Sequence, residues 1–228
     1  MQDDITTIAS VMNIKTKPTT LPREYRTWFY HLPYDKPFVL SISGDAFAGK
    51  SSFMLKLMSK LCQPNVGNTK GDKCLYINIE EPLHRGATIQ EKCRNMKLPP
   101  SALKNIDIIS NPDLNTIEEI IKILDSKEYK YCVIDSISMM CGNSQKKHFE
   151  VWEFIQNRKE SFFCVLHADK NKKEKMKGAG IWQYHPDICV WLHRTPNGTY
   201  AEFKKNRYHH GKLTNFDTYN EKVITDVF

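Results

Sequence analysis

Short apolar runs alternate along the chain with segments in which apolar residues recur at helical spacing. The apolar runs predict five buried strands, at 38–43, 74–79, 106–109, 131–134 and 162–166. Helices are expected between them at about 49–62, 84–96, 115–124 and 148–156, and the third of these places its isoleucines and a leucine on one face. Strands that alternate with helices predict an α/β fold with a mostly parallel central sheet and helices on both faces.

Both ends of the chain depart from this alternation. Two C-terminal runs, at 188–192 and 199–205, are separated by only a Pro-Asn-Gly turn and predict an antiparallel hairpin. Residues 1–36 show no clear periodicity and contain three prolines, although the cluster Trp28-Phe29-Tyr30 indicates that part of the segment is ordered. We therefore expect an N-terminal arm at 1–36, packed on the domain or on a neighbour, and one α/β domain at 37–228.

Composition narrows the class of protein. The chain has 228 residues, 40% of them hydrophobic, which is enough for a proper core. The net charge of +7 allows a nucleic-acid partner without proving one. The seven cysteines form no C-x-x-C pair, and several lie inside apolar runs, so they indicate small buried residues in a reducing compartment and not disulfides or a zinc site.

Targeting signals are not expected either. The first ten residues, MQDDITTIAS, have neither a basic nor an apolar region of the kind that a signal peptide needs. No apolar stretch approaches the length that spans a bilayer. We expect a cytoplasmic protein without a membrane partner, in a cell or in an infected host.

The most informative motif follows the first strand. Residues 44–51 read G-D-A-F-A-G-K-S, which is the phosphate-binding P-loop, G-x-x-x-x-G-K-S, with a strand before it and a helix after it. Lys50 is expected to reach the β- and γ-phosphates of ATP, and Ser51 to hold Mg²⁺. The residues expected to contact the nucleotide are Gly44, Asp45, Ala46, Phe47, Ala48, Gly49, Lys50, Ser51 and Ser52.

Two further strands end in carboxylates. Asp135 closes the apolar run at 131–134, and this position favours a second Mg²⁺ ligand near Ser51, although an Asp here can also cap the next helix. Glu80 and Glu81 close the second strand, which lies beside the P-loop strand in most such sheets. We interpret Glu80 as the base that activates water and Glu81 as a cap of the next helix, while a solvated pair at a helix start is the plain alternative.

A histidine and a run of lysines follow the fifth strand. His167 at the strand end is a candidate sensor of the γ-phosphate, and a polar residue with a purely structural role fits the position equally well. The segment 169–177 is polar and basic, so it is either a mobile loop that follows a phosphate backbone or a solvated surface. Its candidate DNA-binding residues are Lys170, Lys172, Lys173, Lys175 and Lys177.

A last pair of cations ends the hairpin. Lys205 and Arg207 are two residues apart on a strand and therefore point to the same face. They could act as catalytic fingers that reach the nucleotide of a neighbouring subunit. A basic strand end without a catalytic role is the alternative.

These pieces, in this order, resemble the RecA superfamily of ATPases, and above all RadA and the DnaB-type replicative helicases. Tyr76 to Glu81 resembles the RadA strand that ends in paired glutamates, and Val133 to Ile137 resembles its Walker B strand. His167 to Lys170 is similar to the strand end before the second DNA-binding loop, and Lys205-Asn206-Arg207 matches the finger motif. The resemblance covers about 37–211 and implies a RecA-like P-loop core.

The resemblance also implies a function. A bare core of this kind, without the zinc finger of RadA or the collar of DnaB, is similar to phage-encoded RadA-like proteins. It implies a DNA-dependent ATPase in recombination, repair or replication that works as a hexameric ring or filament. Residues 139–147 and 169–178 would then form loops that hold single-stranded DNA, with a single-strand-binding or annealing protein as a further partner. A DnaB-like helicase motor and a KaiC-like signalling ATPase that needs no DNA remain the alternatives.

Overall fold

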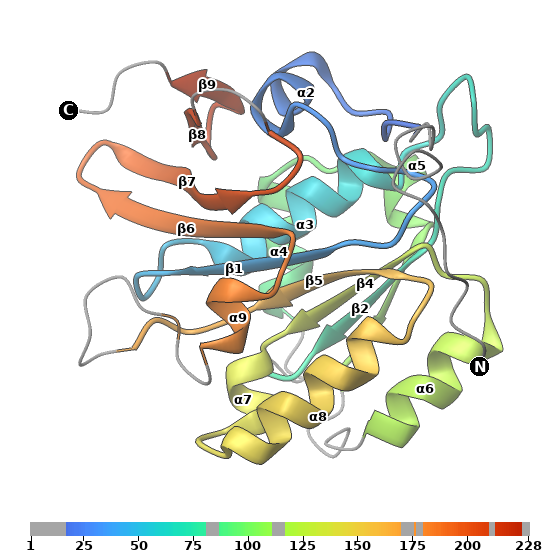
Figure 1. The fold of residues 1–228 in the computed structure, drawn as a ribbon. Helices are drawn as coiled ribbons and strands as arrows, with labels where there is room; N and C mark the ends of the chain where they lie inside the picture. The colour runs from blue at the N-terminus through green and yellow to red at the C-terminus, as the bar shows by residue number, and fades with distance from the viewer. Residues whose placement is uncertain are drawn as a thin grey trace, which may run out of the picture.

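The computed structural model describes residues 17–80, 87–110, 117–169, 176, 180–209 and 213–224. Within this part of the chain, nine strands form one sheet with the order β3-β2-β4-β5-β1-β6-β7-β8-β9 (Figure 1). Neighbours from β3 to β6 pair in parallel, and neighbours from β6 to β9 pair antiparallel. The strands are β1 Val39–Gly44, β2 Cys74–Asn78, β3 Ile106–Ile109, β4 Tyr131–Asp135, β5 Ser161–Val165, β6 Ile188–Thr195, β7 Gly198–Asn206, β8 Asn215–Asp217 and β9 Lys222–Ile224.

Helices cover both faces of the sheet. In Figure 1, α2 and α3 lie on one side, and α6, α7 and α8 lie on the other. The helices are α2 Arg23–Phe29, α3 Lys50–Leu61, α4 Ala87–Asn95, α5 Pro100–Leu103, α6 Ile117–Ser126, α7 Ile137–Cys141, α8 Gln145–Gln156 and α9 Ile181–Tyr184. The predicted fold class, with a mostly parallel sheet and a C-terminal antiparallel hairpin, is confirmed.

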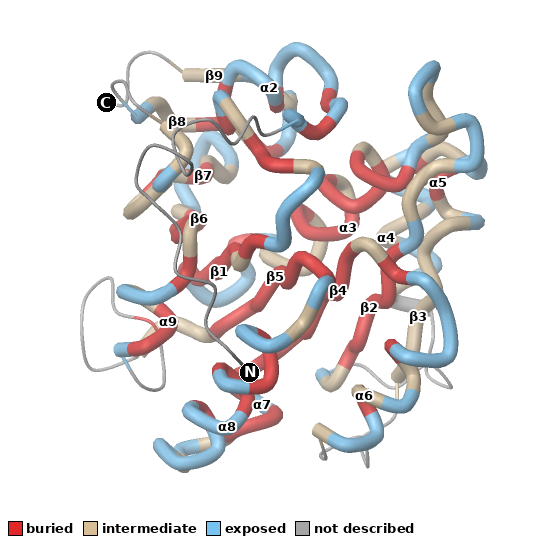
Figure 2. The backbone as a smooth tube through the Cα atoms, turned by 45° about the vertical axis from the view of Figure 1, so that its right-hand side comes forward, coloured by how far each residue is buried: buried red, intermediate tan, exposed pale blue. Residues whose placement is uncertain are grey.

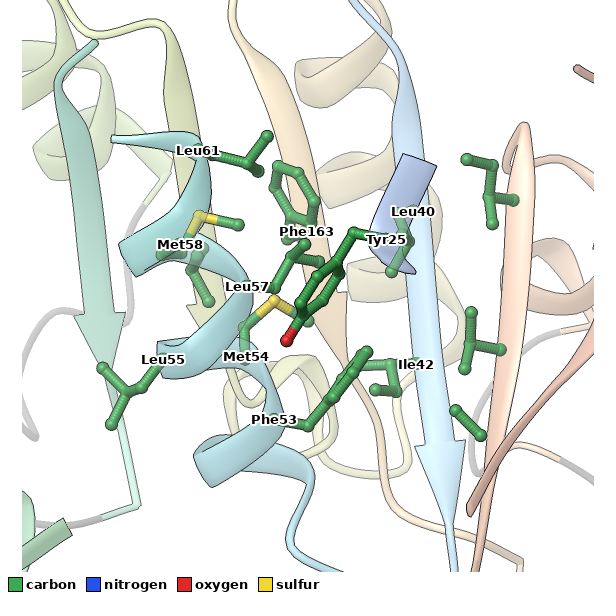
Figure 3. Packing of buried hydrophobic residues seen from close by; sticks show 14 of the residues in the cluster. Tyr25, Leu40, Ile42, Phe53, Met54, Leu55, Leu57, Met58, Leu61 and Phe163 are labelled. Carbon is green, nitrogen blue, oxygen red and sulfur yellow. The ribbon is translucent and has the colours of Figure 1, made fainter. Parts of the chain in front are cut away.

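Two apolar clusters sandwich the central strands, which are buried along their length (Figure 2). On one face, α3 packs Phe53, Leu57 and Leu61 toward the P-loop strand and its neighbour, where Leu40 and Phe163 lie (Figure 3). Each of these side chains is almost fully buried, and such burial stabilises the fold by about 1.5–3 kcal/mol per residue. The helix that follows the P-loop is therefore held firmly against the sheet.

The N-terminal segment shares this core from Leu21 onward. Trp28 of α2 is fully buried and stacks on Phe203 and Phe216, with ring centroids 4.2 and 4.9 Å apart. Its indole N–H donates to the carbonyl of Thr214 at 3.0 Å. These contacts join α2 to β7 and β8, while the division of the chain at residue 36 stays a prediction.

Two expectations about the fold were wrong. The second strand, β2, is not beside the P-loop strand, because β4 and β5 lie between them. Residues 139–147 are not a loop: α7 ends at Cys141, and α8 begins at Gln145 after a short turn. Ser136 and Ser144 cap these helices by accepting from the N–H groups of Met139 and Lys147, which explains why they form.

No helix among the described residues is long and apolar enough to cross a membrane.

Candidate active site

The P-loop leaves β1 at the carboxyl edge of the sheet and lies against β6. Gly44 has a φ of +153°, and a Cβ built there would come within 2.2 Å of the carbonyl oxygen of Leu192. The N–H of Asp45 donates to that same carbonyl at 3.3 Å. Glycine is therefore required at this position by both conformation and space.

The P-loop leads directly into the N-terminus of α3. Gly49 occupies the N-cap in the left-handed conformation with φ +76°, and no side chain caps the helix. The first turn of α3 contains no acidic residue. The positive end of the helix dipole and its backbone N–H groups therefore suit an anion such as a phosphate.

Lys50 lies at the start of this helix and turns back over the loop. Its ammonium group donates to the carbonyl oxygens of Gly44 at 3.2 Å and of Asp45 at 3.0 Å. Burial lowers the pKa of Lys50, whereas the nearby carboxylates of Glu80 and Asp135 raise it. The ammonium thus lies in a partly desolvated position between the P-loop and two carboxylates.

Asp135 ends β4 and is almost fully buried. Its Oδ2 accepts a hydrogen bond of 2.6 Å from the hydroxyl of Tyr76, whereas its Oδ1 has no hydrogen-bond partner among the described residues. Burial raises the pKa of Asp135, and the nearby hydroxyls of Tyr76 and then Ser51 lower it. A buried carboxylate oxygen without a partner, close to a serine hydroxyl, fits the oxygen ligands that Mg²⁺ prefers.

Glu80 and His167 form a pair beside this carboxylate. Nε2 of His167 contacts Oε1 of Glu80, and the hydroxyl of Ser136 lies 3.5 Å from the same nitrogen. The backbone N–H of His167 donates to the hydroxyl of Ser138 at 2.9 Å. The hydrogen bond with His167 is the main cause that lowers the pKa of Glu80.

Glu80 reaches the site although its strand is not beside β1. β2 pairs with β4 in a register that places Asn78 opposite Asp135, and β5 brings His167 from the other side of β4. One small open pocket is lined by residues from α3, β2 and the turn after it, α4 and β4: Ser51, Leu55, Tyr76, Asn78, Glu80, Ile89, Lys92 and Asp135. The structure therefore brings the predicted magnesium ligands and the predicted base into one place.

Sequence reasoning missed three polar residues of this pocket. Tyr76 and Asn78 stand four and two residues before Glu80, so the period of a strand places all three on one face. That polar alternation within an otherwise apolar run was the signal that could have identified them. Lys92 comes from α4 and had no comparable signal, because a lysine on a polar helix normally faces solvent.

The predicted fingers lie near the amino-terminal ends of the parallel strands, whereas the P-loop lies at their carboxyl ends. Lys205 of β7 pairs with Cys189 of β6, and Gly44 of the P-loop pairs with Leu192 of β6. Cys189 and Leu192 are three residues apart. This separation amounts to about 10 Å along the strand. The Lys205 ammonium donates to the carbonyls of Tyr184 and Pro186, both at 2.6 Å, so it does not reach the P-loop of its own chain.

Arg207 lies beside it and is more exposed. Its guanidinium is 3.3 Å from Oδ1 of Asp187, and the side chain keeps 53% of its surface exposed. Oδ2 of Asp187 accepts from the backbone N–H of Val39, the first residue of the P-loop strand. Arg207 is therefore exposed at the surface, and its contact with Asp187 holds the guanidinium in place.

The five lysines expected to bind DNA, and Glu81, lie outside the described residues. Of the segment that carries the lysines, Ala168 and Met176 form an isolated antiparallel bridge. This bridge places Met176 beside Ala168, the residue that follows His167.

Comparisons with known proteins support the fold. No protein-family model matches the sequence, and no curated protein matches it. Among solved structures, the chain is similar to a KaiC-like protein from the hyperthermophilic archaeon Pyrococcus horikoshii OT3, with a TM-score of 0.64 and 14% sequence identity. The match covers 90% of this chain and 94% of that protein. At this identity the likeness shows the fold alone.

Proposed function

We propose that this protein is a Mg²⁺-dependent ATP hydrolase with a RecA-like core. The observation that carries the proposal is the convergence of Ser51, Glu80 and Asp135 on one pocket, with Lys50 between the carboxylates and the P-loop. A P-loop alone supports nucleotide binding. A carboxylate pair of this kind next to it supports hydrolysis, because one carboxylate can support the metal while the other activates water.

Each residue has a distinct task in this proposal. The P-loop amides and Lys50 bind and orient the phosphates. Ser51 and Asp135 would hold Mg²⁺, which when bound neutralises phosphate charge. Glu80 accepts a proton from the attacking water, and its lowered pKa keeps it ionised for this task. His167, in contact with Glu80, would respond to changes at the γ-phosphate.

The proposal includes assembly into a homo-oligomer, either a hexameric ring or a filament. Lys205 and Arg207 lie at the edge of the sheet opposite to their own P-loop, so a catalytic role for them requires the nucleotide of a neighbouring subunit. Fingers supplied in this way make hydrolysis depend on assembly.

We further propose that single-stranded DNA stimulates the ATPase, in the manner of RadA-type and DnaB-type proteins, in recombination, repair or replication. The support is the basic composition of the segment 169–177 together with the bridge that joins Ala168 and Met176 beside His167. Lysines there would contact the phosphate backbone, and a single-strand-binding or annealing protein would act on the same DNA.

Steady-state ATP hydrolysis with and without single-stranded DNA, at low and moderate salt, tests the proposal. Stimulation that fades with salt supports the DNA-dependent function, and a forked-duplex assay then separates a helicase motor from a recombinase. Hydrolysis that DNA does not affect favours a signalling ATPase of the KaiC-like kind. Absence of hydrolysis in the assembled protein with Mg²⁺ would refute the proposed activity.

A further inference from the structure

The contact between Tyr76 and Asp135 is not explained by packing alone. Tyr76 is 2% exposed and Asp135 is 3% exposed, so both groups lie in the interior at the carboxyl edge of the sheet. The hydroxyl donates to Oδ2 over 2.6 Å, which is the short distance typical of a hydrogen bond to an ionised carboxylate. Such bonds are about twice as strong as those between neutral groups.

The two carboxylate oxygens of Asp135 have different surroundings. Oδ2 is occupied by Tyr76, while Oδ1 has no hydrogen-bond partner among the described residues. Ser51 lines the same pocket as Asp135. We propose that Tyr76 is a positioning residue that holds one oxygen of Asp135 and thereby presents the other to Mg²⁺.

This inference rests on the proposed function, because it assigns Asp135 to the metal. It adds a residue that does not touch the metal itself. The Tyr76 ring is part of the apolar cluster on the α3 face of the sheet, which fixes the position of its hydroxyl. A partner that fixes the orientation of a metal ligand usually changes metal affinity about tenfold or more when it is removed.

A purely structural role for the bond is the competing explanation. In that case the carboxylate would simply satisfy a buried phenol. Tyr131, which is fully buried, argues against this need, because its hydroxyl donates to no acceptor among the described residues. The core of this protein thus tolerates a tyrosine hydroxyl without an acceptor.

The chain contains a matched control. Tyr129 donates to Oδ2 of Asp107 at 2.8 Å, which is the same phenol–carboxylate contact at a place that does not line the pocket. The variants Tyr76→Phe and Tyr129→Phe each lose one such bond and keep the ring. Tyr129→Phe therefore shows what the loss of a phenol–carboxylate bond does away from the pocket, and an effect on the metal should be specific to Tyr76.

The test is a Mg²⁺ titration of the binding of a fluorescent ATP analogue to the full chain, with binding in the presence of a chelator as the baseline. We expect Tyr76→Phe to raise the Mg²⁺ concentration at half-maximal effect about tenfold. Affinity for the metal-free nucleotide should stay unchanged, and Tyr129→Phe should match the wild type. Equal midpoints for Tyr76→Phe and the wild type would overturn the inference, as would an equal loss of affinity with and without Mg²⁺.

A double-mutant cycle then tests whether Tyr76 acts through Asp135. Asp135→Asn should weaken the Mg²⁺ effect, and adding Tyr76→Phe to it should cause no further change. Additive effects would mean that Tyr76 acts independently of Asp135 and would overturn the inference. Failure of the wild type to bind nucleotide would refute the proposed function instead, so the two failures are distinguishable.

Discussion

Nε2 of His167, just after β5, contacts Oε1 of Glu80, just after β2, although the two residues are 87 positions apart in the chain. β4 lies between their strands, so the pair bridges across the end of the strand that carries Asp135. The bond is the largest cause of the lowered pKa of Glu80. The proposed base and the proposed sensor are therefore one unit.

This pairing predicts a shift in the pH dependence of hydrolysis. His167→Ala removes the bond that lowers the pKa of Glu80 and leaves the effect of burial, which raises it, so Glu80 should become protonated at higher pH. The acid limb of the kcat/KM profile should accordingly move toward neutral pH. His193→Ala is the matched control, because His193 contacts Glu202 at 2.6 Å on the hairpin, away from the pocket. An acid limb unchanged by His167→Ala would contradict the pairing.

The contact between Glu80 and His167 also predicts how the folding stability depends on pH. A carboxyl whose folded pKa lies below its ordinary value of 4.5 stabilises the protein above that value, and the contribution is lost as the pH falls through the folded pKa. Urea midpoints of the wild type and Glu80→Gln should therefore differ at neutral pH and converge at acid pH. A difference that persists through the acid range would show that the pair does not cause it.

Lys50→Ala should abolish ATP turnover. Its ammonium lies over the P-loop carbonyls at the first residue of α3. The substitution therefore removes the positive side chain that is expected to bind the phosphates. Lys56→Ala is the control, because Lys56 lies on the same helix and also donates to two carbonyls, those of Thr218 and Tyr219. We expect a loss of at least about 100-fold for Lys50→Ala only, measured as steady-state phosphate release. Retained turnover would show that the P-loop is not the catalytic site.

Local sequence signals sufficed to nominate those residues of the candidate site that depend on one strand or one loop, and their roles stay predictions. The P-loop was recognised from its G-x-x-x-x-G-K-S motif, whereas Asp135 and His167 were each recognised as the polar residue that follows an apolar run. The place of the Glu80 strand in the sheet was not predicted correctly. Strand order is set by pairing between distant segments, and the sequence of a buried parallel strand does not reveal its neighbours. Its expected place beside β1 was wrong for this reason.

Short elements were missed for a different reason. α7 and α9 have five and four residues, which is too short for the apolar period of a helix to be recognised. α2 was also missed, although its buried residues Tyr25, Trp28 and Phe29 stand at the i, i+3 and i+4 spacing of a helix, because a helix of seven residues offers only one such repeat. These helices are stabilised by tertiary contacts such as the stacking of Trp28 on Phe203, which a single sequence does not reveal.

The two glycines that frame the P-loop should differ in their tolerance of alanine. At Gly49 the φ of +76° strains any other residue, but a Cβ would meet no atom within 4 Å, so Gly49→Ala should cost about 1 kcal/mol. At Gly44 the Cβ would also collide with the Leu192 carbonyl oxygen, which adds about 1–3 kcal/mol. Urea unfolding should therefore rank Gly44→Ala as the less stable variant. The reverse order would mean that β6 is not held against the P-loop as described.

The last prediction concerns the fingers. Arg207 is exposed at the edge opposite its own P-loop, so Arg207→Ala should leave nucleotide binding intact and depress turnover by about 10³-fold in the assembled protein. Lys50→Ala inactivates the P-loop but keeps Arg207. When the two variants are coexpressed and assembled together, an intact P-loop can meet an intact Arg207 across a subunit interface. The mixed assembly should hydrolyse ATP faster than the sum of the separate variants.

The mixing experiment separates the possible roles of Arg207. A structural role predicts that Arg207→Ala loses nucleotide affinity, and mixing cannot restore it. A role within its own chain predicts that every mixed assembly stays inactive, because no subunit then carries both Lys50 and Arg207. Since Arg207 is supported by Asp187, whose other oxygen accepts from Val39 at the start of the P-loop strand, Asp187→Asn should show a milder loss of turnover that mixing with Lys50→Ala also relieves. Only a finger that acts on a neighbouring subunit accounts for recovery in both mixtures.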